Sequence, residues 1–213
     1  MAFGGEDVDT YDVAYDVPGK GNIVEATVTR CKNGIVVNYP EDYMRRRDPD
    51  CLLVADDNDT DKPKYDDVYN KDFEPLLQET FQWLKGQELV VFAFKSGGEE
   101  YGYDTLLVAP ANAGFFACAV ADLQGFISMY DISEDFNPKA VIFLAPPFRH
   151  THFDGKQIVI HNRLKEIHEL YSYNLYPGPS AKKGIYGVLL NIGENEGWTT
   201  VHASTVKVIT PYD

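Results

Sequence analysis

The stretch Pro177-Gly-Pro-Ser-Ala-Lys-Lys-Gly184, followed by Ile185-Tyr-Gly-Val-Leu-Leu-Asn191, says most about this chain. Its glycines and prolines break the backbone, and the apolar residues after them predict a helix over residues 185–191. Lys182 and Lys183 then stand on the first turn, beside unpaired N–H groups and the positive end of the helix dipole. Lysines are unfavourable there unless an anion binds. Two interpretations stay open: an anion site, or two solvated surface lysines.

The composition narrows the class of protein. The chain has 213 residues, of which 44% are hydrophobic, enough to bury a core. Its net charge of −14 disfavours binding to nucleic acid or to anionic membranes. A local basic pocket for a small anion remains compatible with this charge. The three cysteines form no C-x-x-C pattern and no signal peptide is visible, so we expect a cytoplasmic protein. The longest apolar stretch, residues 106–123, is broken by Pro110 and does not predict a membrane span.

The order of strand and helix patterns predicts a mixed α/β (α+β) fold, with a mixed β-sheet and a few packed helices. We expect an extended N-terminal arm over residues 1–22 and a single lobe over residues 23–213. Helical spacing covers residues 73–84, 115–123 and 185–191. Strand patterns cover residues 23–30, 35–39, 51–55, 89–94, 103–109, 125–129, 140–144, 157–161, 166–173, 198–203 and 206–209.

Two further groups of candidate metal ligands do not match the spacing of known metal sites. The acidic connector over residues 56–72 begins like a calcium loop, but Lys62 and Val68 stand where that loop needs glycine and glutamate. We therefore expect a solvated loop. The histidines at positions 150, 152, 161 and 168 lack zinc spacing, although the first two alternate in a possible strand. They are expected to be surface or hydrogen-bonded histidines.

A basic island stands out in this acidic chain. Arg45-Arg-Arg47 lies beside Asp48 and Asp50, and clustered guanidinium groups suit bidentate recognition of carboxylate or phosphate. A solvated turn is the alternative. If the fold brings this island to Lys182 and Lys183, the two form an anion pocket. No G-x-x-x-x-G-K-[ST] phosphate loop is present, so this sequence shows no nucleotide cradle of its own.

Five segments carry distinctive patterns: Arg47-Asp-Pro-Asp-Cys-Leu-Leu-Val54, Trp83-Leu-Lys-Gly-Gln-Glu-Leu-Val-Val-Phe92, Ala140-Val-Ile-Phe-Leu-Ala-Pro-Pro-Phe148, Lys182-Lys-Gly-Ile-Tyr-Gly-Val-Leu-Leu190 and His202-Ala-Ser-Thr-Val206. In this order they resemble the motifs R-S-P-x-D, L-x-G-K-x-L-x-V-F, I-x-N-A-P-x-F, M-K-K-x-I-F and H-C-S-A-N of the phosphoenolpyruvate carboxykinase family. The interval from Lys183 to His202 also matches the family spacing. The resemblance is strongest to a bacterial group of larger carboxykinase-like proteins. It implies the fold of the family's N-terminal, substrate-binding lobe.

The resemblance also implies roles for single residues. Arg47 would hold the substrate carboxylate, with Arg46 as the alternative, and Tyr176 would contact the substrate. Lys182 would stand at the transferring phosphoryl group. Lys183 and His202 would bind a catalytic Mn²⁺ or Mg²⁺, which requires a neutral lysine with a lowered pKa.

The function expected from the resemblance is that of a substrate-side lobe in nucleotide-dependent phosphoryl transfer. The lobe would bind a small carboxylate or phosphate with a divalent metal, while ATP or GTP would come only through a C-terminal lobe in cis that is missing here. Alone it would lack turnover, so whether this chain is an enzyme stays open. The alternatives are a non-catalytic anion-binding or protein-interaction domain of unknown function, and a relic scaffold without a ligand.

Overall fold

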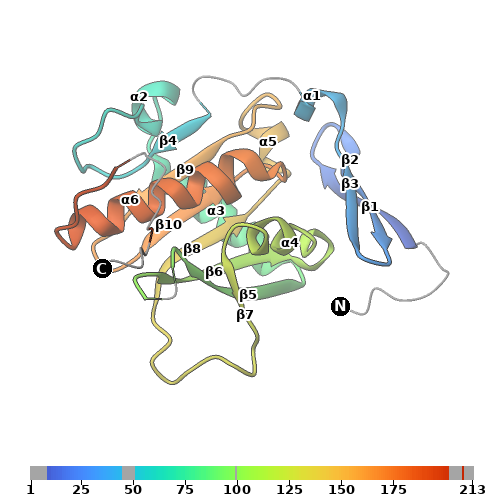
Figure 1. Cartoon of the computed structure of the whole chain (residues 1–213). Coiled ribbons are helices and arrows are strands. Elements are labelled where there is room, and N and C mark those ends of the chain that lie inside the picture. The colour runs from blue at the N-terminus through green and yellow to red at the C-terminus, as the bar shows by residue number, and fades with distance from the viewer. Residues whose placement is uncertain (1–8, 45–50, 99, 202–207, 209–213) are drawn as a thin grey trace.

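The computed structural model describes residues 9–44, 51–98, 100–201 and 208, and it confirms the mixed α+β class (Figure 1). The strands are β1 (Asp9–Val17), β2 (Gly21–Cys31), β3 (Gly34–Asn38), β4 (Leu52–Val54), β5 (Leu89–Ser96), β6 (Tyr103–Pro110), β7 (Gly125–Ile127), β8 (Pro138–Leu144), β9 (Val159–Arg163) and β10 (His168–Ser172). The helices are α1 (Glu41–Met44), α2 (Tyr65–Tyr69), α3 (Phe73–Lys85), α4 (Phe116–Ala121), α5 (Phe148–Thr151) and α6 (Ile185–Asn195), with a 3₁₀ turn η1 (Ala111–Ala113) and a π-helical segment η2 (Gly178–Gly184).

The strands form two sheets. One has three antiparallel strands in the order β1-β2-β3, and the other has seven strands in the order β4-β9-β10-β8-β6-β5-β7. In the large sheet, β4 is parallel to β9, and β10, β8 and β6 run parallel to one another. The pairs β9–β10, β5–β6 and β5–β7 are antiparallel. The short strand β4 lies at one edge, next to β9.

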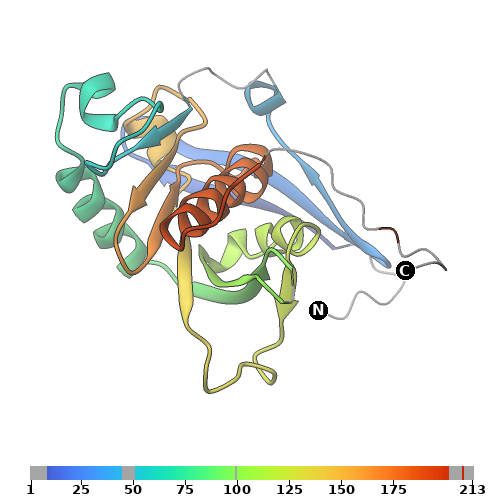
Figure 2. The same cartoon turned by 60° about the vertical axis from the view of Figure 1, so that its left-hand side comes forward.

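Alternation along the strands divides the large sheet into two apolar faces. In β8, Ala140, Ile142 and Leu144 join the core that includes α4, η2 and α6, whereas Phe143 packs on the opposite side with the core of α3. Figures 1 and 2 show α4 and α6 on one face of the sheet and α3 on the other. The helices therefore cover both faces, as three stacked layers require.

The small sheet packs into the core that also contains α4, η2 and α6. Val13 and Tyr15 of β1 are buried together with Ala26 and Val28 of β2, and the Tyr15 hydroxyl donates to Asn112 Oδ1 at 2.9 Å. Residues 9–17 of the expected N-terminal arm are thus a strand that pairs with β2 along its whole length. The alternation of apolar residues at 13, 15 and 17 is the signal for this strand.

Several local predictions need correction. His150 lies in helix α5 and His152 is its C-cap, so the expected strand alternation of these two histidines is wrong. Residues 198–201 form no strand, and the rest of the two predicted C-terminal strands lies outside the described residues, apart from residue 208, which is also not in a strand. Within the described ranges, no helix has the length and apolarity needed to cross a membrane.

Candidate functional site

The helix that carries Lys182 and Lys183 begins earlier than the sequence predicts. The π-helical segment η2 starts at Gly178 with a proline in its first turn and runs directly into α6. Proline is tolerated in a first turn because no N–H bond is lost there. Both lysines lie in the last turn of η2, so the prediction that they stand on the first turn of a helix is wrong. Unpaired N–H groups at a helix start cannot explain them, but π-helical segments often mark functional sites.

Gly184 allows η2 to approach the sheet. A Cβ atom at this position would lie 2.5 Å from Leu170 Cδ1 of β10 and 3.2 Å from the Pro179 carbonyl oxygen. We expect Gly184→Ala to lower the free energy of unfolding by about 1–3 kcal/mol, because overpacking forces the helix away from the strand. Urea denaturation measures this change.

The matched control is Gly193→Ala in α6. Gly193 is also buried, but its Cβ would make only ordinary contacts of 3.7 Å with Thr200 and Trp198. Alanine is favoured over glycine in a helix by roughly 0.5–1 kcal/mol, so this variant should be neutral or more stable. Equal effects at the two positions would contradict the close packing at Gly184.

An open pocket of about 540 Å³ lies where α6 crosses the β4 edge of the sheet. Strand β4 gives apolar residues, β9 and β10 give polar ones, and the connector after β4 closes one side. We call it the α6 pocket; its lining residues are Leu52, Val54, Thr60, Asp61, Lys62, His161, Arg163, His168, Lys183, Tyr186, Gly187, Leu190, Asn191 and Glu194. Of the predicted site residues that the structure describes, Lys183 is the one that lines it.

Two of the three cations in this pocket are paired with carboxylates. The Arg163 guanidinium binds Asp56 through Nε and Nη2, at 2.8–3.1 Å, and the Arg163 backbone N–H donates to the same carboxylate at 2.7 Å. Burial opposes ionisation of Asp56, but these hydrogen bonds outweigh it and lower its pKa. Lys62 pairs with Asp61 at 2.8 Å. These pairs leave Lys183 as the pocket cation that makes no ion pair with a described residue.

The structure separates the two adjacent lysines. Lys183 is half-buried, and its Nζ lies 5.3 Å from the centroid of the Tyr186 ring. An ammonium over an aromatic face is stabilised by the ring quadrupole. Lys182 is exposed and does not line the α6 pocket. The fold therefore assigns the pocket to Lys183 alone.

The sequence analysis missed a buried histidine pair in the same pocket. His161 of β9 and His168 of β10 have exposed fractions of 3% and 2%, and His161 Nδ1 lies 2.7 Å from His168 Nε2. Burial lowers the pKa of His161 to about 4; for His168, burial and the neighbouring His161 lower it to about 2. Both rings are therefore neutral at neutral pH. The sequence did carry a signal for this pair. His161 is two residues from buried Val159, and His168 is two residues from buried Leu170. Strand residues two apart point to the same face, so both histidines share a buried face.

Tyr176 lies apart from the α6 pocket, next to helix α1. Its ring stands at 5.4 Å from that of Tyr39, which in turn lies at 5.4 Å from Tyr43 of α1. The Tyr39 hydroxyl donates to the Leu175 carbonyl oxygen at 2.9 Å. Arg46, Arg47 and His202 lie outside the described residues. The last described side chain before the two arginines is that of Tyr43, whose hydroxyl accepts from the Leu175 N–H. The chain after the arginines enters β4, which lines the α6 pocket.

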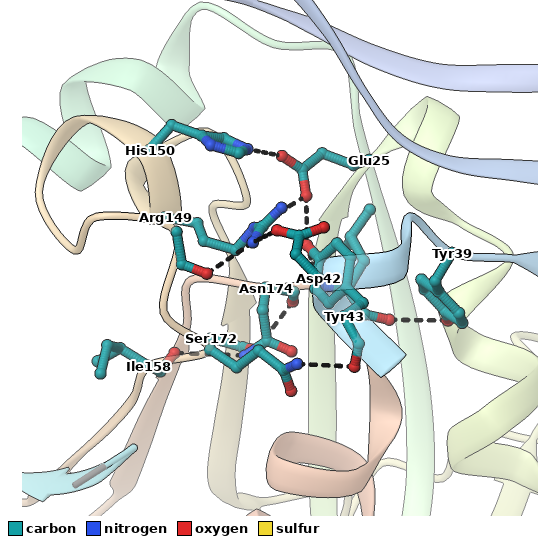
Figure 3. A network of polar contacts seen from close by, with 12 residues as sticks. Glu25, Tyr39, Asp42, Tyr43, Arg149, His150, Ile158, Ser172 and Asn174 are labelled. Atoms are coloured by element: carbon teal, nitrogen blue, oxygen red, sulfur yellow. Dashed lines mark hydrogen bonds and ion pairs between the residues drawn. The ribbon is translucent and has the colours of Figure 1, made fainter. Parts of the chain in front are cut away.

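A buried polar network holds α1 and α5 to the small sheet (Figure 3). Glu25 of β2 binds Arg149 Nε at 3.3 Å and also contacts the Tyr43 hydroxyl and His150 Nε2. Arg149 in turn donates to Asp42 at 2.5 Å and to a backbone carbonyl, and its Cζ stands 4.1 Å above the centroid of the Tyr43 ring. We call Glu25, Asp42, Tyr43, Arg149 and His150 the Glu25 network. It holds α1, the helix that precedes the three arginines in the sequence, to α5 and β2.

Burial and charge set the ionisation of this network. Burial disfavours the charged form of Asp42, but the hydrogen bond from Arg149 prevails and lowers the pKa of that carboxyl. Burial and the neighbouring Glu25 carboxylate raise the pKa of Tyr43. Tyr43 is therefore a neutral donor to Glu25.

The described part of the chain contains no group of three His, Cys, Asp or Glu side chains placed to hold a metal ion. The expected metal pair includes one described residue, Lys183, whose position over the Tyr186 ring suits a charged ammonium. A metal-bound lysine must instead be neutral. The described donors thus do not by themselves fit a metal site.

Comparison with known proteins gives a family. A family model described as "Domain of unknown function (DUF4914)" matches residues 1–213. No curated protein matches the chain.

Proposed function

The chain belongs to the DUF4914 family, and for this member we propose a substrate-side lobe of a carboxykinase-like protein that transfers phosphoryl groups with a nucleotide. The lobe binds a small carboxylate or phosphate anion in the α6 pocket. Turnover requires a nucleotide site, for which this sequence has no phosphate loop. The resemblance of five segments to carboxykinase motifs supports the reaction class.

The observation that carries the proposal is the state of Lys183. It is a half-buried cation in a pocket of about 540 Å³, and it makes no ion pair with a described residue. A small anion would supply the missing counter-charge, and charge-assisted hydrogen bonds are the stronger kind in such sites. Phosphoryl transfer depends on positioning and on neutralising charge, which a fixed ammonium provides.

Other predicted residues complete the proposal. Arg47 or Arg46 would grip the substrate carboxylate, since the chain after them enters the strand that lines the pocket. Tyr176 and Lys182 do not line the α6 pocket, and their contacts with the substrate and the phosphoryl group stay predictions from the resemblance. The predicted Mn²⁺ or Mg²⁺ site at Lys183 and His202 is an alternative to this anion contact, because a lysine that binds a metal is neutral and cannot pair with the anion as an ammonium.

Thermal unfolding tests the anion site. We expect oxalate or phosphate to raise the melting temperature of the wild-type chain by roughly 5–10 °C at a hundredfold excess over Kd, because the ligand binds the folded state. Lys183→Ala should abolish the shift. Lys85→Ala, an exposed lysine of α3 across the sheet, removes the same charge and should keep it.

Further outcomes of the same experiment distinguish between the possible functions of the site. An added shift with Mn²⁺ that disappears in His202→Ala would support the metal-assisted carboxykinase reading. An anion shift that is indifferent to metal would favour the non-catalytic anion-binding domain. Absence of any shift with either anion would overturn the proposal.

A further inference from the structure

The His161–His168 pair contains a polar atom without a partner. Among the described residues, His161 Nε2 has no hydrogen bond and is out of contact with bulk water. Buried polar atoms are nearly always paired, so an exception in a native fold calls for an explanation. This atom belongs to a side chain that lines the α6 pocket. A ligand bound in this pocket would supply the missing partner.

The hydrogen bonds around the pair fix which nitrogen carries the proton. Asn191 Nδ2 of α6 lies 3.2 Å from His168 Nδ1, and an amide nitrogen can only donate. His168 Nδ1 therefore accepts, and the proton of this neutral ring is on Nε2. That proton is donated to His161 Nδ1 at 2.7 Å. The proton of His161 is then on Nε2, which is a donor facing no acceptor.

Gly187 allows α6 to pack closely against the edge of the His161 ring. A Cβ atom there would lie 3.2 Å from His161 Cε1 and 3.8 Å from Nε2. Any side chain at position 187 would thus occupy the space beside this edge of the ring. Because Nε2 is out of contact with water, a hydrogen bond to a ligand requires the imidazole to shift toward the pocket.

We propose that His161 is a second ligand-binding residue of the α6 pocket, whose Nε2–H donates to an oxygen of a bound phosphate or carboxylate. Asn191 and His168 act as positioning residues that hold His161 in this tautomer. This inference rests on the proposed anion site and adds the neutral donor that pairs with the charged Lys183. A neutral donor keeps its hydrogen bond without the cost of a second buried charge.

Nitrogen NMR of the histidine rings tests the proposal in the full chain. In the free protein we expect His161 to be protonated on Nε2 and His168 likewise, each with a bare Nδ1. Inorganic phosphate and oxalate are titrated separately, and both should shift the His161 Nε2–H signal at saturation. A response to only one of them identifies which oxygen chemistry the site takes.

Two variants give independent readouts. His161→Phe keeps a buried ring without the donor and should weaken anion binding at least tenfold. Asn191→Leu removes the amide donor to His168 Nδ1, which orients the two rings. Both tautomers of His161 should then appear, and the affinity for the anion should fall severalfold. A merely structural Asn191 would leave the tautomer unchanged.

The outcomes separate this inference from the proposed function. If neither anion binds the wild-type chain, the anion site itself fails. If anions bind and Lys183→Ala abolishes binding while the His161 signal and the His161→Phe affinity stay unchanged, only the role of His161 is overturned. A bare Nε2 on His161 in the free protein would also overturn it, because such a ring cannot donate.

Discussion

Replacing Arg149 with methionine is expected to lower the free energy of unfolding by about 3–5 kcal/mol. Arg149 and Glu25 both have exposed fractions of 1%, so the substitution leaves a carboxylate buried without its guanidinium partner. It also removes the Arg149 hydrogen bonds to Asp42 and to the Gly155 carbonyl oxygen. Guanidinium chloride denaturation, followed by circular dichroism, measures the loss.

A double-mutant cycle shows whether the loss comes from the stranded charge. The Glu25→Gln/Arg149→Met variant removes both buried charges and should be more stable than Arg149→Met alone, because the carboxylate that remains, Asp42, is 46% accessible and solvated. Arg30→Met is the control, since Arg30 and Asp9 form an exposed pair with side chains 54% and 58% accessible. It should cost less than about 1 kcal/mol. Additive losses in the cycle would contradict a coupled buried pair.

Acidification from pH 7 to pH 5 is expected to destabilise the fold through the His161–His168 pair. The folded pKa values of about 4 for His161 and about 2 for His168 lie below the unfolded value of about 6.5. Between these values the unfolded chain binds protons that the folded chain does not. Stability is therefore complete above pH 6.5 and falls as the pH drops toward 4, by about 1.4 kcal/mol per pH unit for each histidine.

The variant His161→Gln/His168→Gln should lose most of this pH slope. His152→Gln should keep it, because His152 is partly exposed and pairs with Glu79 at 3.2 Å rather than with the buried pair. Asp42 and Asp56 also have lowered pKa values. Their contribution is present above pH 3.8 and is lost below it, so it lies outside the interval from pH 7 to pH 5 in which the histidines are measured. An unchanged slope in the double variant would show that the histidines ionise freely in the fold.

Local patterns predicted the regular elements well where one physical rule dominates. The apolar spacing at Phe73, Leu76 and Leu84 predicted α3, and the structure buries these three residues. The predicted strands over residues 23–30 and 35–39 form a hairpin, in which β2 and β3 pair antiparallel from Cys31 and Gly34 onward and Lys32 and Asn33 make the turn. The start of the η2–α6 helix was missed, because the glycines and prolines of residues 177–184 are tolerated by a π-helical first turn.

The sequence by itself determined the mixed α+β class, the alternating strands and the choice of Lys183 as a residue of interest. These follow from short-range periodicity and from charge in an acidic chain. Only the tertiary structure decided which lysine lines a pocket, and that His161, His168 and Asn191 meet there. Residues of β9, β10 and α6 come together through strand pairing and helix packing. These contacts join different segments, so the residue spacing within any one segment does not predict them.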